Sequence, residues 1–384
     1  MTTQQTTSDW RNLIAACGAI TVFGLAFGMT YPLLSLILEA RDVSSDMIGM
    51  NSAMMPLGIL LFSSVIPVAA KKFGARRIAI IAAIASAFIM ILYKWFDTLS
   101  AWFLLRLIQG MTISTLFVLS ESWIVKFAGD ANRGKIVAIY ASVLSLSFGA
   151  GPFIVSLMGI EGWAPFIIGM IVMSLGCIPL MFIQESADTQ PEETVASGIF
   201  SFAPKAPMLM ACVAAFSILD AATLALMPVY GIYNGLDVVT SANMLTALIV
   251  GNAVLQLPVG WLADKFEHRL VLAGCAFTTT VMLLILPFVI GSFWMWPVLV
   301  IAGTTGYGVY TVSLTSLGDR FSGTELVNGT SAFAVMWGVG ALFGSVSAGG
   351  VMKLTGSHGL PVSLALVYLA LMIGLIFRMR GHGK

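Results

Sequence analysis

The chain has 384 residues, of which 58% are hydrophobic and 10% are charged, and its formal net charge is +1. Soluble domains carry about a quarter charged residues, and a soluble fold of this length has too little interior to hide so much apolar surface. The composition therefore indicates a membrane protein, and the small net charge excludes a basic surface for nucleic acid.

Apolar runs long enough to cross about 30 Å of hydrocarbon as helices occur twelve times. They lie at 13–37, 47–70, 78–96, 101–127, 136–159, 163–183, 207–230, 242–263, 270–291, 295–318, 328–352 and 360–378. We expect an all-α membrane protein with twelve transmembrane helices in two sets of six. The expected parts are a tail at 1–12, a six-helix bundle at 13–183, a polar linker at 184–206, a second bundle at 207–379 and a tail at 380–384.

The basic residues predict how these helices are oriented. If the amino terminus is cytosolic, fifteen of the nineteen basic residues fall in cytosolic segments, three fall on the outer side (Arg41, Lys94 and Lys353), and Arg106 lies within a helix. Cytosolic loops of membrane proteins carry such an excess of lysine and arginine. We therefore expect both termini in the cytosol of a bacterial cell and the helices in its inner membrane. The polar start of the chain has no small-residue cleavage site, so we expect a retained tail and not a signal peptide.

A fixed offset of 193 positions relates the two halves of the chain. It pairs Asp264, Lys265, Phe266 and Arg269 with Lys71, Lys72, Phe73 and Arg76, and it pairs Gly251, Gly303 and Gly344 with Gly58, Gly110 and Gly151. One spacing that is kept from the second helix to the fifth indicates two tandem copies of one helical bundle.

Several motifs resemble those of the major facilitator superfamily. Gly260-Trp-Leu-Ala-Asp264-Lys-Phe-Glu-His-Arg269 resembles the signature loop between its eighth and ninth helices, and Arg106-Leu-Ile-Gln109-Gly110 is similar to its fourth-helix motif. Gly149-Ala-Gly151-Pro152 partly matches the fifth-helix motif of its antiporters. Glu121-Ser-Trp, Asn132 to Tyr140 and Ala302 to Tyr310 resemble the YcaD-like subgroup. The resemblance implies a twelve-helix secondary transporter whose fourth and seventh helices face a central cavity.

The signature loop predicts a latch. Asp264 can accept hydrogen bonds from Arg269 or from amides at a helix start, with Gly260 and Lys265 in the same loop. The first copy has Lys71 at the position of Asp264, so either Asp130 or Glu121 replaces that acid or the second half carries most of the closing energy. The glycine-proline motif either serves only close helix packing or forms a surface that slides during gating; its residues are Gly149, Gly151 and Pro152.

Three charged residues lie at membrane depth, where charge is costly unless it is paired or used: Arg106, Glu121 and Asp220. Asp220 lies about 20 Å into the seventh helix and Arg106 about 8 Å into the fourth, so the two can meet at one level. We expect Asp220 to carry a proton, the alternative being a static hydrogen bond between helices. Arg106 either faces the cavity or extends to lipid headgroups. Glu121, about 22 Å from Arg106, is either an inner proton site or a partner of Lys126, Arg133 or the 71–77 loop.

The cavity helices offer a mixed set of polar side chains around these charges. The candidates are Tyr31, Gln109, Ser114, Tyr140, Asn252, Gln256, Thr305, Tyr307 and Tyr310. Such a lining, with much apolar area, suits a modest amphiphilic molecule or organic ion better than a sugar. The alternative is that several of these groups only hydrogen-bond across helices.

The expected function is secondary transport by alternating access, with proton-coupled efflux as the first reading and proton-coupled uptake as the second. An enzyme is remote, because His268, His358 and His382 lie in loops or the tail and the helices offer no converging nucleophile and base. A non-transporting receptor or scaffold on the same fold is also remote. The four cysteines lie in different apolar runs, so we expect no disulfide, metal site or cofactor. The expected partners are a small-molecule substrate, protons and the bilayer, with one chain forming a complete transport unit.

Overall fold

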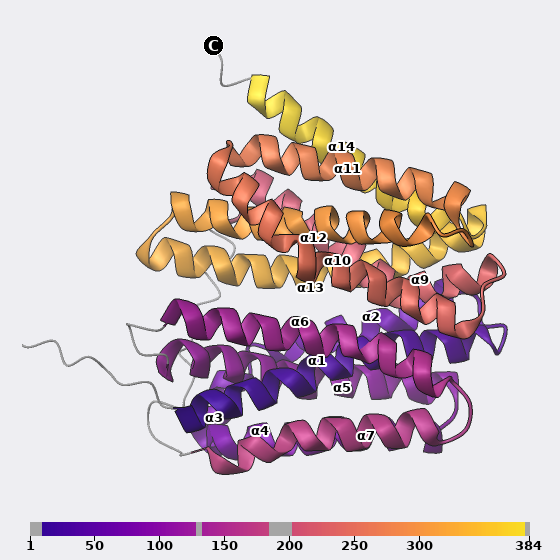
Figure 1. Cartoon of the computed structure of the whole chain (residues 1–384). Coiled ribbons are helices and arrows are strands. Elements are labelled where there is room, and N and C mark those ends of the chain that lie inside the picture. Colours follow the sequence, from indigo (N-terminus) through magenta and orange to yellow (C-terminus); the bar gives the residue numbers. More distant parts are fainter. Residues whose placement is uncertain (1–9, 128–132, 184–201, 381–384) are drawn as a thin grey trace, which may run out of the picture. The chain divides into compact units, whose positions relative to one another are not determined.

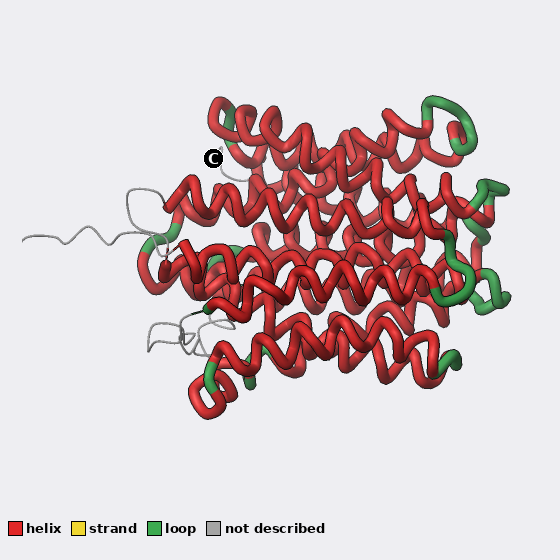
Figure 2. The backbone as a smooth tube through the Cα atoms, turned by 60° about the horizontal axis from the view of Figure 1, so that its bottom comes forward, coloured by secondary structure: helices red, strands yellow, loops and turns green. Residues whose placement is uncertain are grey.

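The computed structural model describes residues 10–127, 133–183 and 202–380, which are helical throughout apart from short turns (Figures 1 and 2). The first half contains α1 Trp10–Glu39, α2 Ser45–Phe62, α3 Ile66–Phe73, α4 Ala75–Trp95, α5 Leu99–Phe127, α6 Arg133–Met158 and α7 Ala164–Cys177, which continues as a 3-10 turn, Ile178–Phe182. The second half contains α9 Pro207–Tyr233, α10 Val238–Lys265, α11 His268–Val289, α12 Met295–Arg320, α13 Gly323–Thr355 and α14 Gly359–Arg380.

Twelve of the described helices are long and apolar enough to cross a membrane, as the sequence predicted. The predicted span at 47–70 was wrong in extent, because α2 ends at Phe62 and the short helix α3 follows from Ile66. Ser63 and Ser64 lie at the break, but two serines between apolar stretches are too few to show in a hydropathy average over about twenty residues. Pro67 in the first turn of α3 marks it, since proline fits the start of a helix but disrupts its interior.

The chain divides into two compact units, and the division does not follow the linker alone. Unit 1 comprises Met1–Leu33 and Met54–Thr194, and unit 2 comprises Leu34–Ala53 and Val195–Lys384. The end of α1 and the first half of α2 therefore pack with helices of the second repeat. Within unit 2, Lys353 Nζ donates to Asp46 Oδ2 at 2.8 Å, and Ser45 Oγ donates to the Gly349 carbonyl oxygen at 3.0 Å.

The tandem repeat is visible in the helix contacts of both units. A Cβ atom added at Gly58 would overlap the carbonyl oxygen of Leu107, and one added at Gly110 would overlap that of Met55. In unit 2, Gly251 meets Val300 and Gly303 meets Leu248 in the same way. The 193-residue offset relates each of these four residues to its counterpart in the first half. The glycines thus permit one and the same close helix crossing in α2–α5 and in α10–α12.

We expect Gly251→Ala to lower the free energy of unfolding of the purified protein by about 1–3 kcal/mol, because the new methyl group must push α10 away from α12. Gly274→Ala is the matched control. Gly274 also lies inside a long helix, α11, but nothing lies within 4 Å of an added Cβ there. Alanine favours a helix over glycine by about 1 kcal/mol, so the control should match or exceed the wild type in a melting experiment. Equal melting temperatures for the two variants would show that the α10–α12 crossing tolerates a side chain.

Candidate functional site

The strongest candidate site surrounds Asp220 in the middle of α9. Its side chain is buried, with 4% exposed. Tyr307 of α12 donates its hydroxyl to Asp220 Oδ1 at 3.0 Å, and Trp337 of α13 donates its indole N–H to Asp220 Oδ2 at 3.2 Å. Helices α9, α12 and α13 thus converge on one carboxylate.

Aromatic side chains occupy the space around this carboxylate. Phe216 lies one turn before Asp220 on α9. The centroid of its ring is 5.5 Å from that of Tyr307 and 4.7 Å from that of Tyr310. Tyr310 in turn contacts Phe333, with centroids 6.3 Å apart. Within the described part of unit 2, no basic side chain forms an ion pair with Asp220. An ionised Asp220 would hold a buried charge with two neutral donors and no counter-ion from the described part of unit 2, which is costly at membrane depth. Protonation removes that charge.

A second polar centre lies in unit 1 at Arg106 of α5. The side chain is fully buried, so the alternative in which it extends to lipid headgroups was wrong. Its Nη2 atom donates to the Thr30 carbonyl oxygen at 3.4 Å, and the guanidinium lies over the ring of Tyr31, 5.0 Å from the centroid. Nε and Nη1 have no hydrogen-bond partner among the described residues. Because Arg106 and Asp220 belong to different units, their pairing stays a prediction.

The structure connects the other candidates of unit 1 in different ways. Tyr31 stacks on Phe27 at 5.4 Å beside Arg106. Gln109 accepts a hydrogen bond from the Tyr93 hydroxyl at 2.7 Å, and its Nε2 atom is buried without a described partner. Ser114 is buried, and its hydroxyl likewise lacks one. The Tyr140 hydroxyl lies 2.9 Å from Ser120 Oγ. Gln109 and Tyr140 therefore bond across helices, which was the alternative for this set.

In unit 2, Tyr307 and Tyr310 are the sequence candidates that gather around Asp220. Gln256 of α10 donates to Thr311 Oγ1 at 2.6 Å, and Thr305 lies 2.8 Å from Thr279 Oγ1 of α11. Asn252 is half-buried, and its Oδ1 atom has no partner in the described part of the chain. The polar candidates thus divide between the carboxylate site and separate helix contacts.

Glu121 lies exposed on α5, with no ion pair to any side chain that the structure describes. The side chains of its expected partners Lys126 and Arg133, and the whole of Asp130, lie outside the described residues. Whether Glu121 holds a proton or an ion pair therefore stays a prediction.

The signature loop joins α10 to α11. Asp264 is exposed, and the carboxylate beside Arg269 is that of Glu267, 4.0 Å from Nε. Lys265 lies over the ring of Trp261, 4.0 Å from the centroid, and an added Cβ at Gly260 would meet nothing within 4 Å. The latch between Asp264 and Arg269 stays a prediction.

The glycine-proline motif lies on α6 in unit 1. An added Cβ at Gly151 would overlap the backbone of Gly28 and Met29 on α1. Pro152 is buried beside this contact, and Gly149 is half-buried. The motif therefore brings α1 and α6 close together, and its role in gating stays a prediction.

The sequence reasoning missed Trp337 and Phe216. Tryptophans of membrane proteins gather at the two membrane interfaces, whereas Trp337 lies fifteen residues into the 33-residue helix α13. A buried indole N–H usually finds a hydrogen-bond partner. The mid-span position of Trp337 was thus a signal for a polar centre nearby.

The sequence was also compared with known families. The Major Facilitator Superfamily matches residues 16–251 and 209–383. The chain belongs to this family. Members of this superfamily are membrane transporters and not enzymes, so the chain is a secondary transporter.

Two relatives support this assignment, and each matches almost the whole length of this chain. An uncharacterised transporter of this superfamily from Bacillus subtilis, YfkF, is 27% identical over 370 residues, which cover 92% of this chain and 93% of the relative. The uncharacterised transporter YcaD of Salmonella heidelberg is 24% identical over 375 residues, with 94% of each chain covered. The expected likeness to YcaD is thus confirmed.

Solved structures share the fold. The nucleoside transporter NupG has a TM-score of 0.76 at 14% identity, and the match covers 95% of this chain and 98% of that transporter. A D-xylose–proton symporter has a TM-score of 0.74 at 14% identity, with 97% of both chains covered. At these identities the likeness shows the superfamily fold alone.

Proposed function

We propose that this transporter exports a small amphiphilic molecule or organic ion in exchange for protons, with Asp220 as the proton-binding group. The observation that carries the proposal is the buried Asp220 carboxylate, held by neutral donors from two other helices. A group of this kind can carry a proton in one state of the transporter and release it in another, which is the least that proton coupling requires.

Protonation would act on helices α12 and α13 through the donors of Asp220. An ionised carboxylate accepts freely from both Tyr307 and Trp337. A protonated one can still accept from Trp337 through its carbonyl oxygen, but its own O–H then donates to the Tyr307 oxygen, so the hydrogen bond to α12 reverses its direction while the charge is lost. The proton thereby changes which helix arrangement is the more stable, as alternating access needs.

The direction of transport is proposed from a sequence motif. The partial antiporter motif at Gly149, Gly151 and Pro152 favours export. Proton-coupled uptake is the second candidate, and the fold shared with a D-xylose–proton symporter is compatible with it. We place the protein in a bacterial inner membrane with both termini cytosolic, because most of its basic residues fall on the side of the termini. We also propose that a single chain transports.

A thermal-shift screen of purified protein against metabolites, organic cations and drugs tests the proposal, with Asp220→Asn measured beside the wild type at several pH values. Asparagine can accept from Trp337 through its oxygen and donate to the Tyr307 oxygen through its NH₂ group, so the variant keeps both contacts without the charge. We expect a ligand that raises the melting temperature of the wild type in a pH-dependent manner. With Asp220→Asn the pH dependence should disappear.

Asp237→Asn is the matched control, because it makes the same change in the same unit at the N-cap of α10, outside the membrane. Asp237 accepts from the Thr240 backbone N–H at 2.9 Å, a role that asparagine fills equally well. The variant Asp237→Asn should keep the pH dependence of ligand stabilisation that the wild type shows. A ligand that stabilises the wild type and Asp220→Asn equally at every pH would exclude Asp220 as the proton site.

A further inference from the structure

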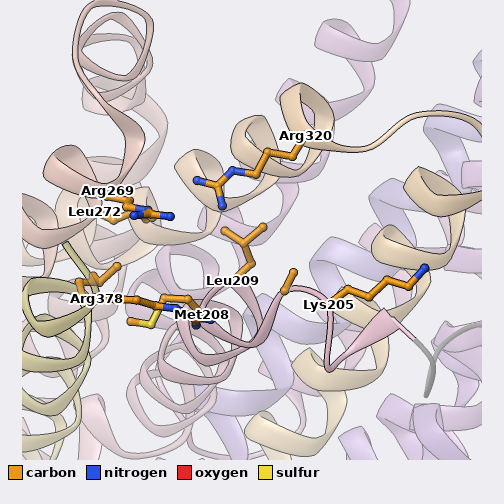
Figure 3. Close-up of a pocket in the computed structure, with 9 residues that line it drawn as sticks. Lys205, Met208, Leu209, Arg269, Leu272, Arg320 and Arg378 are labelled. Atoms are coloured by element: carbon orange, nitrogen blue, oxygen red, sulfur yellow. The ribbon is translucent and has the colours of Figure 1, made fainter. Parts of the chain in front are cut away.

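A basic cavity of about 230 Å³ lies in unit 2, away from Asp220 (Figure 3). Its lining includes Lys205, Arg269, Arg320 and Arg378 and no acidic residue. The arginines come from the start of α11 and from the ends of α12 and α14. The cavity is near the beginning of α9, about 20 Å along that helix from Asp220. It is therefore a separate feature from the proposed proton site.

The basic groups of this cavity are incompletely neutralised. Lys205 points away from the arginines in Figure 3 and forms an ion pair with Glu325. The carboxylate that approaches Arg269 is that of Glu267, 4.0 Å away. Arg320 has no acidic partner among the described residues. The positive-inside rule explains arginines at helix ends, but it does not explain why three of them line one cavity that no described acidic residue lines.

The first turn of α9 borders the same cavity. Met208 and Leu209 line the cavity from the first turn of α9, where N–H groups have no partner within the helix. Unpaired N–H groups and the positive end of the helix dipole attract anions, phosphate groups above all. Arginine forks match phosphate oxygens in pairs. The cavity thus fits a phosphate-type anion, and its volume far exceeds the roughly 30 Å³ of one water molecule.

The surroundings indicate where that phosphate comes from. Leu270 and Phe377, the direct neighbours of Arg269 and Arg378, are 52% and 69% exposed. Leu272 and Leu375 form apolar parts of the cavity wall. In a membrane-spanning chain, exposed apolar side chains beside helix ends face lipid, so a lipid can place its chains on this surface and its headgroup among the arginines. We propose that the cavity binds the phosphate headgroup of an anionic phospholipid.

The test is lipid binding by the intact purified protein in detergent, measured by native mass spectrometry. Phosphatidylglycerol and phosphatidylcholine are titrated separately, and inorganic phosphate is added as a competitor. The wild type should hold one phosphatidylglycerol in preference to phosphatidylcholine. The double variant Arg269→Gln/Arg320→Gln should bind phosphatidylglycerol about thirtyfold more weakly. Each basic group near a membrane surface contributes about 1 kcal/mol, and about 1.4 kcal/mol corresponds to a tenfold change in affinity.

Two further variants keep the result interpretable. Lys72→Gln/Arg77→Gln removes two exposed basic residues of unit 1, outside the cavity, and should bind like the wild type. Arg269→Lys/Arg320→Lys keeps the charge and should retain most of the binding, which separates loss of charge from loss of folding. Equal phosphatidylglycerol binding by the wild type and the Gln double variant would overturn the proposal. If inorganic phosphate displaced phosphatidylglycerol, or bound to the cavity alone, the natural ligand would be free phosphate and not a lipid headgroup.

Discussion

Asp220→Asn is expected to abolish proton-driven accumulation in proteoliposomes and to leave exchange of substrate for substrate intact. One coupled proton lets a gradient of one pH unit drive about a tenfold concentration ratio, since one pKa unit corresponds to about 1.36 kcal/mol. The wild type should reach a ratio of that order, and the variant should stay near unity. Exchange survives because asparagine keeps the contacts to Tyr307 and Trp337 and needs no proton.

The measurement uses the ligand found by thermal shift, in vesicles with an imposed pH gradient and again with labelled substrate on both sides. Asp237→Asn is the control and should accumulate like the wild type. Accumulation by Asp220→Asn at the wild-type ratio would reject Asp220 as the coupling group and direct attention to Glu121. Loss of both accumulation and exchange would assign Asp220 to substrate binding alone.

Arg106→Met is expected to raise thermal stability while it abolishes transport. The guanidinium is fully buried, with Nε and Nη1 lacking a described partner. No acidic side chain in the described part of unit 1 forms an ion pair with it. Replacing buried ionic groups by apolar side chains of similar volume often stabilises proteins, by about 1–4 kcal/mol. A charge kept at such a cost indicates a use in the transport cycle.

Melting temperature and flux of Arg106→Met are compared with those of Arg77→Met, which makes the same change at an exposed position of unit 1. The exposed variant should change neither quantity appreciably, since surface substitutions usually stay within about 0.5 kcal/mol. A lower melting temperature for Arg106→Met would mean that the contacts to Thr30 and Tyr31 hold unit 1 together. The arginine would then be structural.

Membrane spans and the repeat could be predicted because both depend on local or periodic features of the sequence. Hydropathy over about twenty residues identifies a span, and an offset of 193 positions survives in glycines such as Gly58 and Gly251. The break between Phe62 and Ile66 could not be predicted from hydropathy, because Ser63 and Ser64 barely change an average over about twenty residues. Pro67 was the available signal.

The partners of the site residues were harder to predict. The depth of Asp220 follows from its distance along α9, but the rotation of a helix that is apolar on all sides leaves no periodic pattern. Tyr307 was among the cavity candidates, whereas Trp337, 117 residues from Asp220, was not. Likewise the sequence placed Gln109 at the cavity, but its hydrogen bond joins it to Tyr93 of α4. Contacts between distant helices depend on packing, which one sequence does not encode locally.

The assignment of Leu34–Ala53 to unit 2 bears on how the polypeptide can be divided. A fragment cut within 184–206 would carry this segment without Lys353 and Gly349, its partners in α13. The complementary fragment would in turn expose the surface that the segment covers. Pro32, just before the first boundary, and Pro56, just after the second, each remove a backbone hydrogen bond from their helices. The second half of the chain is therefore not an independent folding module, because the first half contributes a segment that unit 2 needs to become complete.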